Sequence, residues 1–243
     1  MRSTLFASTL AIALGIMSPI VGAIGFPAVV AVQTVDQRLV KADQLRQQAK
    51  EQYQMGRVEA AVQSLQQALK LYREIKNRQG EGKTIHNLGV VYGSRGNNQQ
   101  AIKYLEQCLA IAREIKDRQI EAASRVNLGN IYVSMRNYTK AIGYLEQSLT
   151  IAREIKDRGD ERLALNNIGT TLEMQKKLDL AIVFYQQSIK VSESIRKDNR
   201  SLSQERQDSY TRTVAETYHR LAKLLFGRGK ILEASKIIEL IEP

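Results

Sequence analysis

Few side chains in this sequence can do covalent or metal chemistry. His86 and His219 are the only histidines, and Cys108 is the only cysteine, so no intramolecular disulfide can form. No Cys–His pair, metal-ligand spacing or glycine-rich phosphate loop occurs. Cys108 takes a position where neighbouring stretches carry alanine or serine, which predicts a buried packing site, and His219 is predicted to be an interface residue of the last helix. We therefore expect no catalysis, no cofactor and no metal.

Asparagine is the polar residue with the most regular spacing. Asn87, Asn127 and Asn167 recur at one constant interval, and further polar side chains stand near them: Lys83, His86, Asn130, Asn166 and Thr170. An amide both donates and accepts hydrogen bonds, so a row of asparagines suits the backbone of an extended peptide. The alternative is structural hydrogen bonding between neighbouring helices. Lys83 and Arg125 would add positive charge, which favours an acidic or C-terminal peptide.

The elements that must position these side chains are helices. The chain has no proline between residues 34 and 242 and is rich in helix-forming residues. Near copies of one 40-residue unit begin at Leu71, Ile111 and Ile151, and the preceding segment fits the same frame. Each unit contains two apolar stripes of helical period separated by a turn, as around residues 94–97. Neither helix can bury its stripe alone, so adjacent units must stack.

Small and large residues recur at fixed places in each unit. A Leu-Gly or Ile-Gly pair lies in the first helix: Leu88-Gly89, Leu128-Gly129 and Ile168-Gly169. A small residue lies where the two helices cross: Ala61, Ala101, Ala141 and Ala181. A large residue follows one turn later: Leu65, Leu105, Leu145 and Tyr185. Small residues let two helix backbones approach closely. The pattern resembles the tetratricopeptide repeat, in the longer variety found in kinesin light chains and cyanobacterial repeat proteins. The resemblance implies an all-α fold, a right-handed α-solenoid of helix-turn-helix repeats.

The resemblance also implies a binding surface. In such proteins the first helices line a concave groove, where asparagines at these places hold peptide backbone or a carboxylate. We therefore expect a protein-protein interaction scaffold with a protein or peptide partner, in part acidic, and a groove formed by the eight residues Lys83, His86, Asn87, Asn127, Asn130, Asn166, Asn167 and Thr170. The full lysine and asparagine clamp of chaperone-binding members is absent, so no chaperone is inferred.

Charge alone does not point to nucleic acid. The 36 Lys and Arg residues exceed the 25 Asp and Glu residues by 11, giving a net charge of +11. The two signs are interleaved throughout the repeats, and no cluster of exposed aromatics for stacking bases is visible. The signature that ends the second helices places Glu114 four residues before Arg118, and Glu154 before Arg158, which predicts helix-stabilising ion pairs.

The N-terminal segment is of a different kind. Residues 1–31 have a positive start, an apolar stretch and small residues, which predicts a cleaved secretory signal or, alternatively, an uncleaved membrane anchor. Either places the rest of the chain outside the cytoplasm. The predicted organisation continues with a linker at 32–40 and repeats over 41–242, in units of about 41–80, 81–120, 121–160 and 161–200 and an offset terminal repeat at 201–242.

The terminal repeat departs from the frame. A polar stretch opens at residues 196–200, and Gly229 and Ala234 then take the turn and crossing positions, later in the chain than the period requires. This tail resembles the repeat that precedes a CHAT domain, a caspase-like protease fold, in cyanobacterial proteins. The alternative function is therefore a structural or regulatory module acting on a separately encoded CHAT-type protease. Its apolar residues also suggest a homo-oligomer formed through the C-terminal helices (Leu221, Leu224, Leu225, Ile231, Ile237, Ile238 and Ile241).

Overall fold

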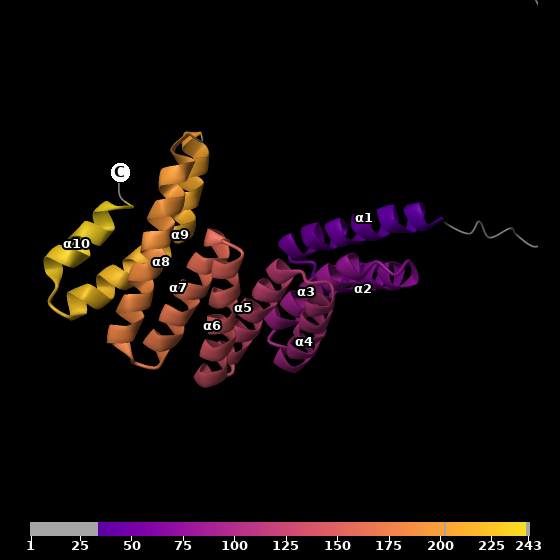
Figure 1. Ribbon diagram of the computed structural model, residues 1–243, viewed down its shortest axis with the longest axis horizontal. Helices are drawn as coiled ribbons and strands as arrows, with labels where there is room; N and C mark the ends of the chain where they lie inside the picture. The colour runs from indigo at the N-terminus through magenta and orange to yellow at the C-terminus, as the bar shows by residue number, and fades with distance from the viewer. Residues whose placement is uncertain (1–33, 202, 242–243) are drawn as a thin grey trace, which may run out of the picture. The chain divides into compact units, whose positions relative to one another are not determined.

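The fold consists of helices stacked in pairs. The computed structural model describes residues 34–201 and 203–241, of which 86% are helical and none is in a strand (Figure 1). The expected all-α solenoid is thus confirmed. Among the same residues no helix is both long and apolar enough to cross a membrane. The predicted export segment, residues 1–31, lies outside the described residues and stays a prediction.

Five helix pairs follow one another, which we number as repeats 1 to 5. The pairs are α1 (Val35–Gln54) with α2 (Val58–Glu74), α3 (Arg78–Ser94) with α4 (Asn98–Glu114), α5 (Arg118–Ser134) with α6 (Tyr138–Glu154), α7 (Arg158–Met174) with α8 (Leu178–Asp198), and α9 (Gln204–Gly227) with α10 (Ile231–Glu239). A short 3-10 helix, η1 (Asn199–Ser201), links α8 to α9. Each helix packs on the next, and α3 also contacts α1 and α5 while α5 contacts α7, so the first helices form one face.

Residues 35–40, which the sequence placed in the predicted linker, form the first turns of α1, because this helix begins at Val35. Thr34 caps this helix: its hydroxyl accepts from the Gln37 N–H at 3.2 Å, and the Gln37 Oε1 accepts from the Thr34 N–H at 3.0 Å. This reciprocal capping box satisfies two backbone donors at the helix start. Leu39 then packs against the buried cluster that contains Leu45 and Tyr72, which gives the first turns an apolar contact.

Every turn within and between repeats 1 to 4 has the same geometry. One residue of positive φ stands in each turn at a constant interval along the chain, first Gly56, then Lys76, Gly96, Lys116, Arg136, Lys156 and Lys176, with φ between 55° and 73°. In the first turn the Gly56 and Arg57 N–H groups donate to the Tyr53 and Gln52 carbonyls, the pattern of a Schellman motif. Arg136 and Lys176, which stand where repeat 2 has Gly96, also adopt this conformation. The lysines between repeats adopt it as well, which the sequence pattern did not reveal.

Close packing inside repeats 2 to 4 depends on the recurring glycine at positions 89, 129 and 169. A Cβ atom added to Gly129 would lie 2.7 Å from the Leu145 Cγ, and one added to Gly89 would lie 2.6 Å from the Leu105 Cγ. Leu105 and Leu145 are fully buried. The large residue of the second helix therefore lies directly on the first helix, where only glycine leaves room for it. This contact fixes the distance between the helices of a pair.

A ladder of ion pairs joins successive repeats along the edge where second helices end. Glu81, Glu121 and Glu161 each bind the arginine in the last turn of the preceding second helix (Arg73, Arg113 and Arg153). The arginine that opens each first helix binds a carboxylate at the end of the same repeat's second helix (Arg78–Glu114, Arg118–Glu154 and Arg158–Asp198). We call this the ladder edge.

The ladder corrects the expected pairing of Glu114 with Arg118. The helix ends at Glu114, and the positive φ of Lys116 reverses the chain, so the two side chains belong to different helices. Glu114 instead pairs with Arg78, and Arg118 with Glu121 and Glu154. The basic signature is therefore largely neutralised within the protein.

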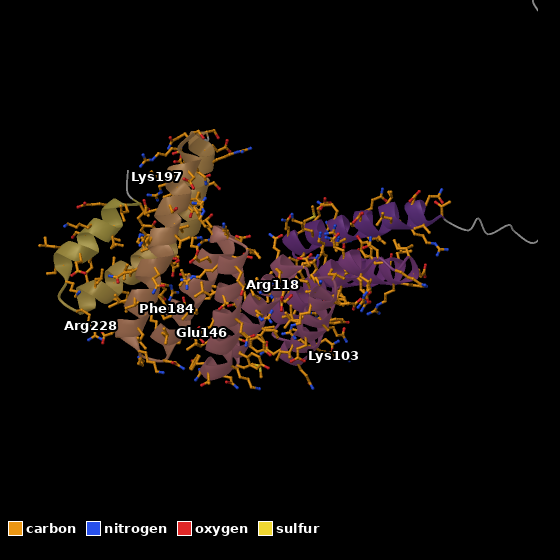
Figure 2. The ribbon with its side chains drawn as sticks, viewed as in Figure 1. Lys103, Arg118, Glu146, Phe184, Lys197 and Arg228 are labelled. Carbon is orange, nitrogen blue, oxygen red and sulfur yellow. The ribbon has the colours of Figure 1, made fainter. Side chains whose placement is uncertain are left out.

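The extra residues that interrupt the 40-residue period after repeat 4 lengthen the helices α8 and α9. The predicted polar stretch at residues 196–200 lies in the last turn of α8 and in η1, and α8 and α9 have 21 and 24 residues where the other helices of repeats 2 to 4 have 17. This hairpin rises beyond the ends of α6 and α7 (Figure 1), with Lys197 near its end (Figure 2).

Candidate functional site

The predicted groove residues all lie on the first helices α3, α5 and α7, but the structure divides them into two hydrogen-bonded groups and three residues outside both groups. His86 and Asn127 meet between α3 and α5, while Asn130, Asn166 and Asn167 meet between α5 and α7. Lys83 and Asn87 make no side-chain contact with a charged or hydrogen-bonding partner in residues 34–201 and 203–241. The Thr170 hydroxyl lies 3.1 Å from the Tyr185 hydroxyl of its own repeat, which donates its proton to Glu173.

His86 is the centre of a directed hydrogen-bond chain. Its Nε2 lies 3.4 Å from the Asn127 Nδ2, which also donates to the Ala123 carbonyl, so Nε2 accepts and the proton is on Nδ1. Nδ1 then donates to the Ser124 hydroxyl at 3.1 Å. Burial lowers the pKa of His86 to about 4, so the ring is neutral at physiological pH. This series of hydrogen bonds requires a neutral ring, in which one nitrogen donates and the other accepts.

The series of hydrogen bonds continues from Ser124 into the core at Cys108. The Ser124 hydroxyl donates to the Cys108 Sγ at 3.2 Å, and the thiol donates to the Gly82 carbonyl at 3.4 Å. Cys108 is fully buried, as predicted, and burial raises the pKa of its thiol. Ser148 and Ser188 make the equivalent bond to the Ala122 and Arg162 carbonyls. The thiol is therefore one of three equivalent links between the helices of a pair.

The second asparagine group joins α5, α7 and α9. Asn167 donates from Nδ2 to the Asn130 Oδ1 at 3.0 Å, and Asn166 donates to the Asn167 Oδ1 at 3.4 Å. The Asn166 Oδ1 accepts from the Thr217 hydroxyl at 2.7 Å. Hydrogen bonding between neighbouring helices, which was the structural alternative, thus does occur. It uses only part of the hydrogen-bonding capacity of each amide.

Two polar groups remain open on this face. Both Nδ2 hydrogens of Asn127 are used, which orients its Oδ1 as an acceptor with no partner among the described side chains. Asn130 uses its Oδ1, which leaves its Nδ2 as a donor, and the residue is exposed. The two amides are three residues apart on α5 and therefore on one face of the helix. An acceptor and a donor are thus presented side by side.

The expected contribution of Arg125 is wrong. Its side chain is buried, binds the Glu121 carboxylate at 2.9 Å and donates from Nε to the Gln147 Oε1 at 3.0 Å. The guanidinium therefore points into the repeat rather than onto the open face. His219, predicted at an interface, is exposed. Lys83 remains half-buried and unpaired within the described chain, so it supplies positive charge near the first group.

Two adjoining hollows lie beside the open amides. One is formed by α1, α2 and α3 and includes Arg46, Lys50, Tyr53 and Asn87; the other is formed by α3 and α5 and includes Gly93, Ser94, Asn127, Asn130 and Ile131. Val90 lines both, and each holds about 250 Å³. We call the two together the groove. Its walls mix apolar and neutral polar groups with the basic side chains of Arg46 and Lys50.

Sequence reasoning missed the apolar part of the groove. Gly93 occupies the position that Tyr53, Val133 and Glu173 take in the other repeats, and this small residue helps to open the second hollow. Its departure from the repeat pattern was the available signal. In the described ranges no group of three or more His, Cys, Asp or Glu side chains could hold a metal ion.

Stacked helix pairs whose first helices carry an open polar face define a helical-repeat protein of the scaffold type. The sequence matches the tetratricopeptide repeat family over residues 42–114 and 120–194, which is more than half of the chain. The chain belongs to the tetratricopeptide repeat family. No curated protein matches it.

Solved structures show the same fold at low sequence identity. A putative kinesin light chain with nearly identical repeats from Podosopora anserina is 20% identical, with a TM-score of 0.60 over 82% of this chain and 92% of that one. Aspartyl phosphate phosphatase F from Bacillus subtilis is 16% identical, with a TM-score of 0.63 over 84% of this chain and 59% of that one. The apo form of RapI is 15% identical, with a TM-score of 0.60 over 83% and 81%. The fold is typical of protein-interaction scaffolds.

Proposed function

We propose that the chain is a non-catalytic scaffold that holds an extended peptide segment of a protein partner in the groove of α1, α3 and α5. The observation that carries this proposal is the open acceptor of Asn127 beside the open donor of Asn130. In an extended peptide the N–H and C=O of one residue point to the same side. One peptide residue can therefore donate to Asn127 and accept from Asn130.

The surroundings of the two amides support a rigid, partly apolar site. The hydrogen bonds from Asn127 to Ala123 and His86 hold its amide in one orientation, so little ordering is needed on binding. The hollow beside it, between Val90, Gly93 and Ile131, has room for a small apolar side chain of the ligand. The backbone contacts would supply orientation, and the hollow would supply selectivity.

Charge favours an acidic segment. Lys50 and Lys83 are unpaired within the described chain, whereas Asp43 is bound by Arg46 at 3.2 Å. Neutral His86 adds no charge. A ligand carboxylate near α1 and α3 would therefore meet two free ammonium groups. At partly exposed sites such attraction is modest and weakens as salt is added.

Replacing both open amides should abolish most of the binding. We expect Asn127→Ala together with Asn130→Ala to weaken the binding of peptides selected from a random display library against the full chain. Two lost hydrogen bonds of about 1 kcal/mol each correspond to roughly tenfold or more in Kd. Calorimetric titration measures the change. Asn98→Ala, on the second-helix side, is the matched control and should bind normally; equal binding by the double variant would exclude the groove.

We propose the C-terminal end as a second contact surface, for another copy of the chain or for the CHAT-type protease of the alternative function. Of its predicted apolar residues, Leu221 and Leu225 are buried, and Leu224, Ile237, Ile238 and Ile241 pack partly on the core. Ile231 and Leu232 remain 59% and 80% exposed, with Phe226 nearby in sequence at 49%. This exposed apolar group is the observation that favours the second surface.

Light scattering tests whether a second copy covers this end. We expect a concentration-dependent dimer that Leu232→Glu converts to monomer, because the charge would have to be buried at the interface. Lys236→Glu, on the same helix, is the control for the change in charge. A strict monomer at high concentration would contradict self-association, and co-purification with a CHAT-type protease, lost in Leu232→Glu, would then identify the regulatory role.

A further inference from the structure

A notch lies where the ladder edge meets the extended hairpin of α8 and α9. Its floor is the turn between α6 and α7, with Ile155, Lys156 and Arg158, and its side contains Arg162, Ile195 and Tyr210. It encloses about 590 Å³. The hairpin stands beyond the ends of α6 and α7 and forms the wall (Figure 1).

The notch is specific to repeat 4. The second helices of repeats 2 and 3 end at the ladder residues Glu114 and Glu154 and do not continue beyond them. In repeat 4, α8 continues to Asp198, and Ser194 replaces the glutamate of the ladder. Asp198 takes over the pairing with Arg158 at 2.5 Å. The same extension that keeps the ladder intact thus creates the notch.

Arg162 is the unusual side chain in this notch. Its Nε is buried without a hydrogen-bond partner, and its guanidinium pairs with no carboxylate of the described chain. The equivalent residues of repeats 2 and 3 are Gly82 and Ala122, so the arginine has no role in the repeat pattern. A guanidinium that has lost water on one side and gained no partner is costly, and an incoming anion would recover the lost interaction.

The remaining charges leave the notch positive. Lys156 is exposed in the turn, and Arg158 is already paired with Asp198 and with the Ser194 hydroxyl. Asp157 is half-buried and accepts from the Asp160 N–H as the helix cap, so its carboxylate is partly used. Arg162 and Lys156 are the two cations free to bind a ligand.

We propose that the notch binds a peptide segment of a partner protein that carries a carboxylate next to an apolar side chain. The carboxylate accepts hydrogen bonds from Arg162 and Lys156, whose donors suit its two oxygens. The apolar side chain lies on Ile155, Ile195 and the Tyr210 ring. Because the lining contains one aromatic ring rather than a series of them, base stacking is not favoured. This surface is separate from the groove and does not depend on it.

The test follows the Arg162 Nε–Hε NMR signal in the full ¹⁵N-labelled chain. The probe is the capped peptide Leu-Asp-Glu-Leu, with capped Leu-Asn-Gln-Leu as the neutral comparison and inorganic phosphate as a third arm. We expect saturable shifts with the acidic peptide alone. The affinities of the variants are measured from the backbone amide signals of Ile155 and Ile195, because Arg162→Gln lacks the side-chain signal. Arg162→Gln should weaken binding at least tenfold, whereas Arg136→Gln, at an exposed arginine in a turn within repeat 3, removes the same charge and should have little effect.

Each other outcome overturns the proposal. An equal shift with the neutral peptide, or unchanged affinity in Arg162→Gln, would show that no ion pair with Arg162 contributes to binding. Tighter binding of phosphate would show that the ligand is a free anion rather than a peptide. Thermal unfolding of Arg162→Gln should occur no earlier than in the natural chain; a lower midpoint would assign Arg162 a structural role. The variant with both Asn127→Ala and Asn130→Ala should give normal shifts, which separates this test from that of the groove.

Discussion

Glu121→Ala is expected to destabilise repeat 3 by about 3–5 kcal/mol, the usual cost of removing one partner from a buried ion pair. Glu121 binds Arg113, Arg118 and Arg125, at 3.1, 2.5 and 2.9 Å. Its side chain is 5% exposed and that of Arg125 is 7% exposed, so the alanine variant leaves a buried guanidinium without its carboxylate. Urea unfolding followed by circular dichroism measures the loss.

Arg125→Leu is the informative comparison, because repeat 4 carries Leu165 at the equivalent position. Among the ion pairs of the described residues, Glu161 of repeat 4 pairs with Arg153 alone, at 2.8 Å. We therefore expect Arg125→Leu to change the free energy of unfolding by less than about 1.5 kcal/mol, as for other well-packed replacements in a core. Equal losses in Glu121→Ala and Arg125→Leu would contradict this account.

The ion pairs of Glu121 also make the stability of the protein depend on pH in the acid range. Burial alone would raise the pKa of Glu121, but hydrogen bonds from Arg113 and Arg118 and the charge of Arg125 outweigh it, so the pKa is lowered on folding. A lowered pKa contributes stability above the unfolded value of about 4.3, and this contribution disappears as the pH falls through the folded value. Glu121→Gln should therefore lose less stability between pH 7 and pH 3.5 than the natural chain does.

Leu145→Ala is expected to cost about 2–5 kcal/mol, because it empties the fully buried space above Gly129. Gly129→Ala alone should also destabilise, by about 1–3 kcal/mol, since its Cβ would lie 2.7 Å from the Leu145 Cγ. In the Leu145→Ala background the same glycine substitution should stabilise, because the space is open and alanine favours helix by about 1 kcal/mol.

Urea unfolding of the two single variants and the double variant measures this change of sign. Leu180→Ala, at a leucine that is 51% exposed, is the control and should stay within about 0.5 kcal/mol of the natural chain. If Gly129→Ala were equally destabilising in both backgrounds, the glycine would be required by the backbone rather than by the leucine that lies on it.

The repeat architecture could be predicted because its signals are local. The positions of Gly129, Ala141 and Leu145 lie within one unit, and their small and large side chains specify the packing of that unit. The ladder could not be predicted in this way. Arg78 and Glu114 are 36 residues apart and meet only once two helices have reversed the chain, whereas the four-residue spacing of Glu114 and Arg118 suggested a pair that the turn at Lys116 separates.

The asparagines illustrate the same division. Their period placed Asn87, Asn127 and Asn167 on first helices, and that prediction is confirmed. Which amide atoms stay open depends on neighbours from other repeats, such as His86 for Asn127 and Asn167 for Asn130. Whether these residues bind a partner stays a prediction.

The uniform turns have a consequence for how such a chain can change in length. Since a residue of positive φ recurs at the same interval in every turn of repeats 1 to 4, one helix could be lost there without altering the geometry of a turn, but every later helix would then exchange faces. Loss of two helices keeps the faces: without residues 117–156, Arg113 would meet Glu161 in place of Glu121. Duplication or deletion is thus tolerated in steps of one whole repeat, and the ladder acts as the template that any added pair must match.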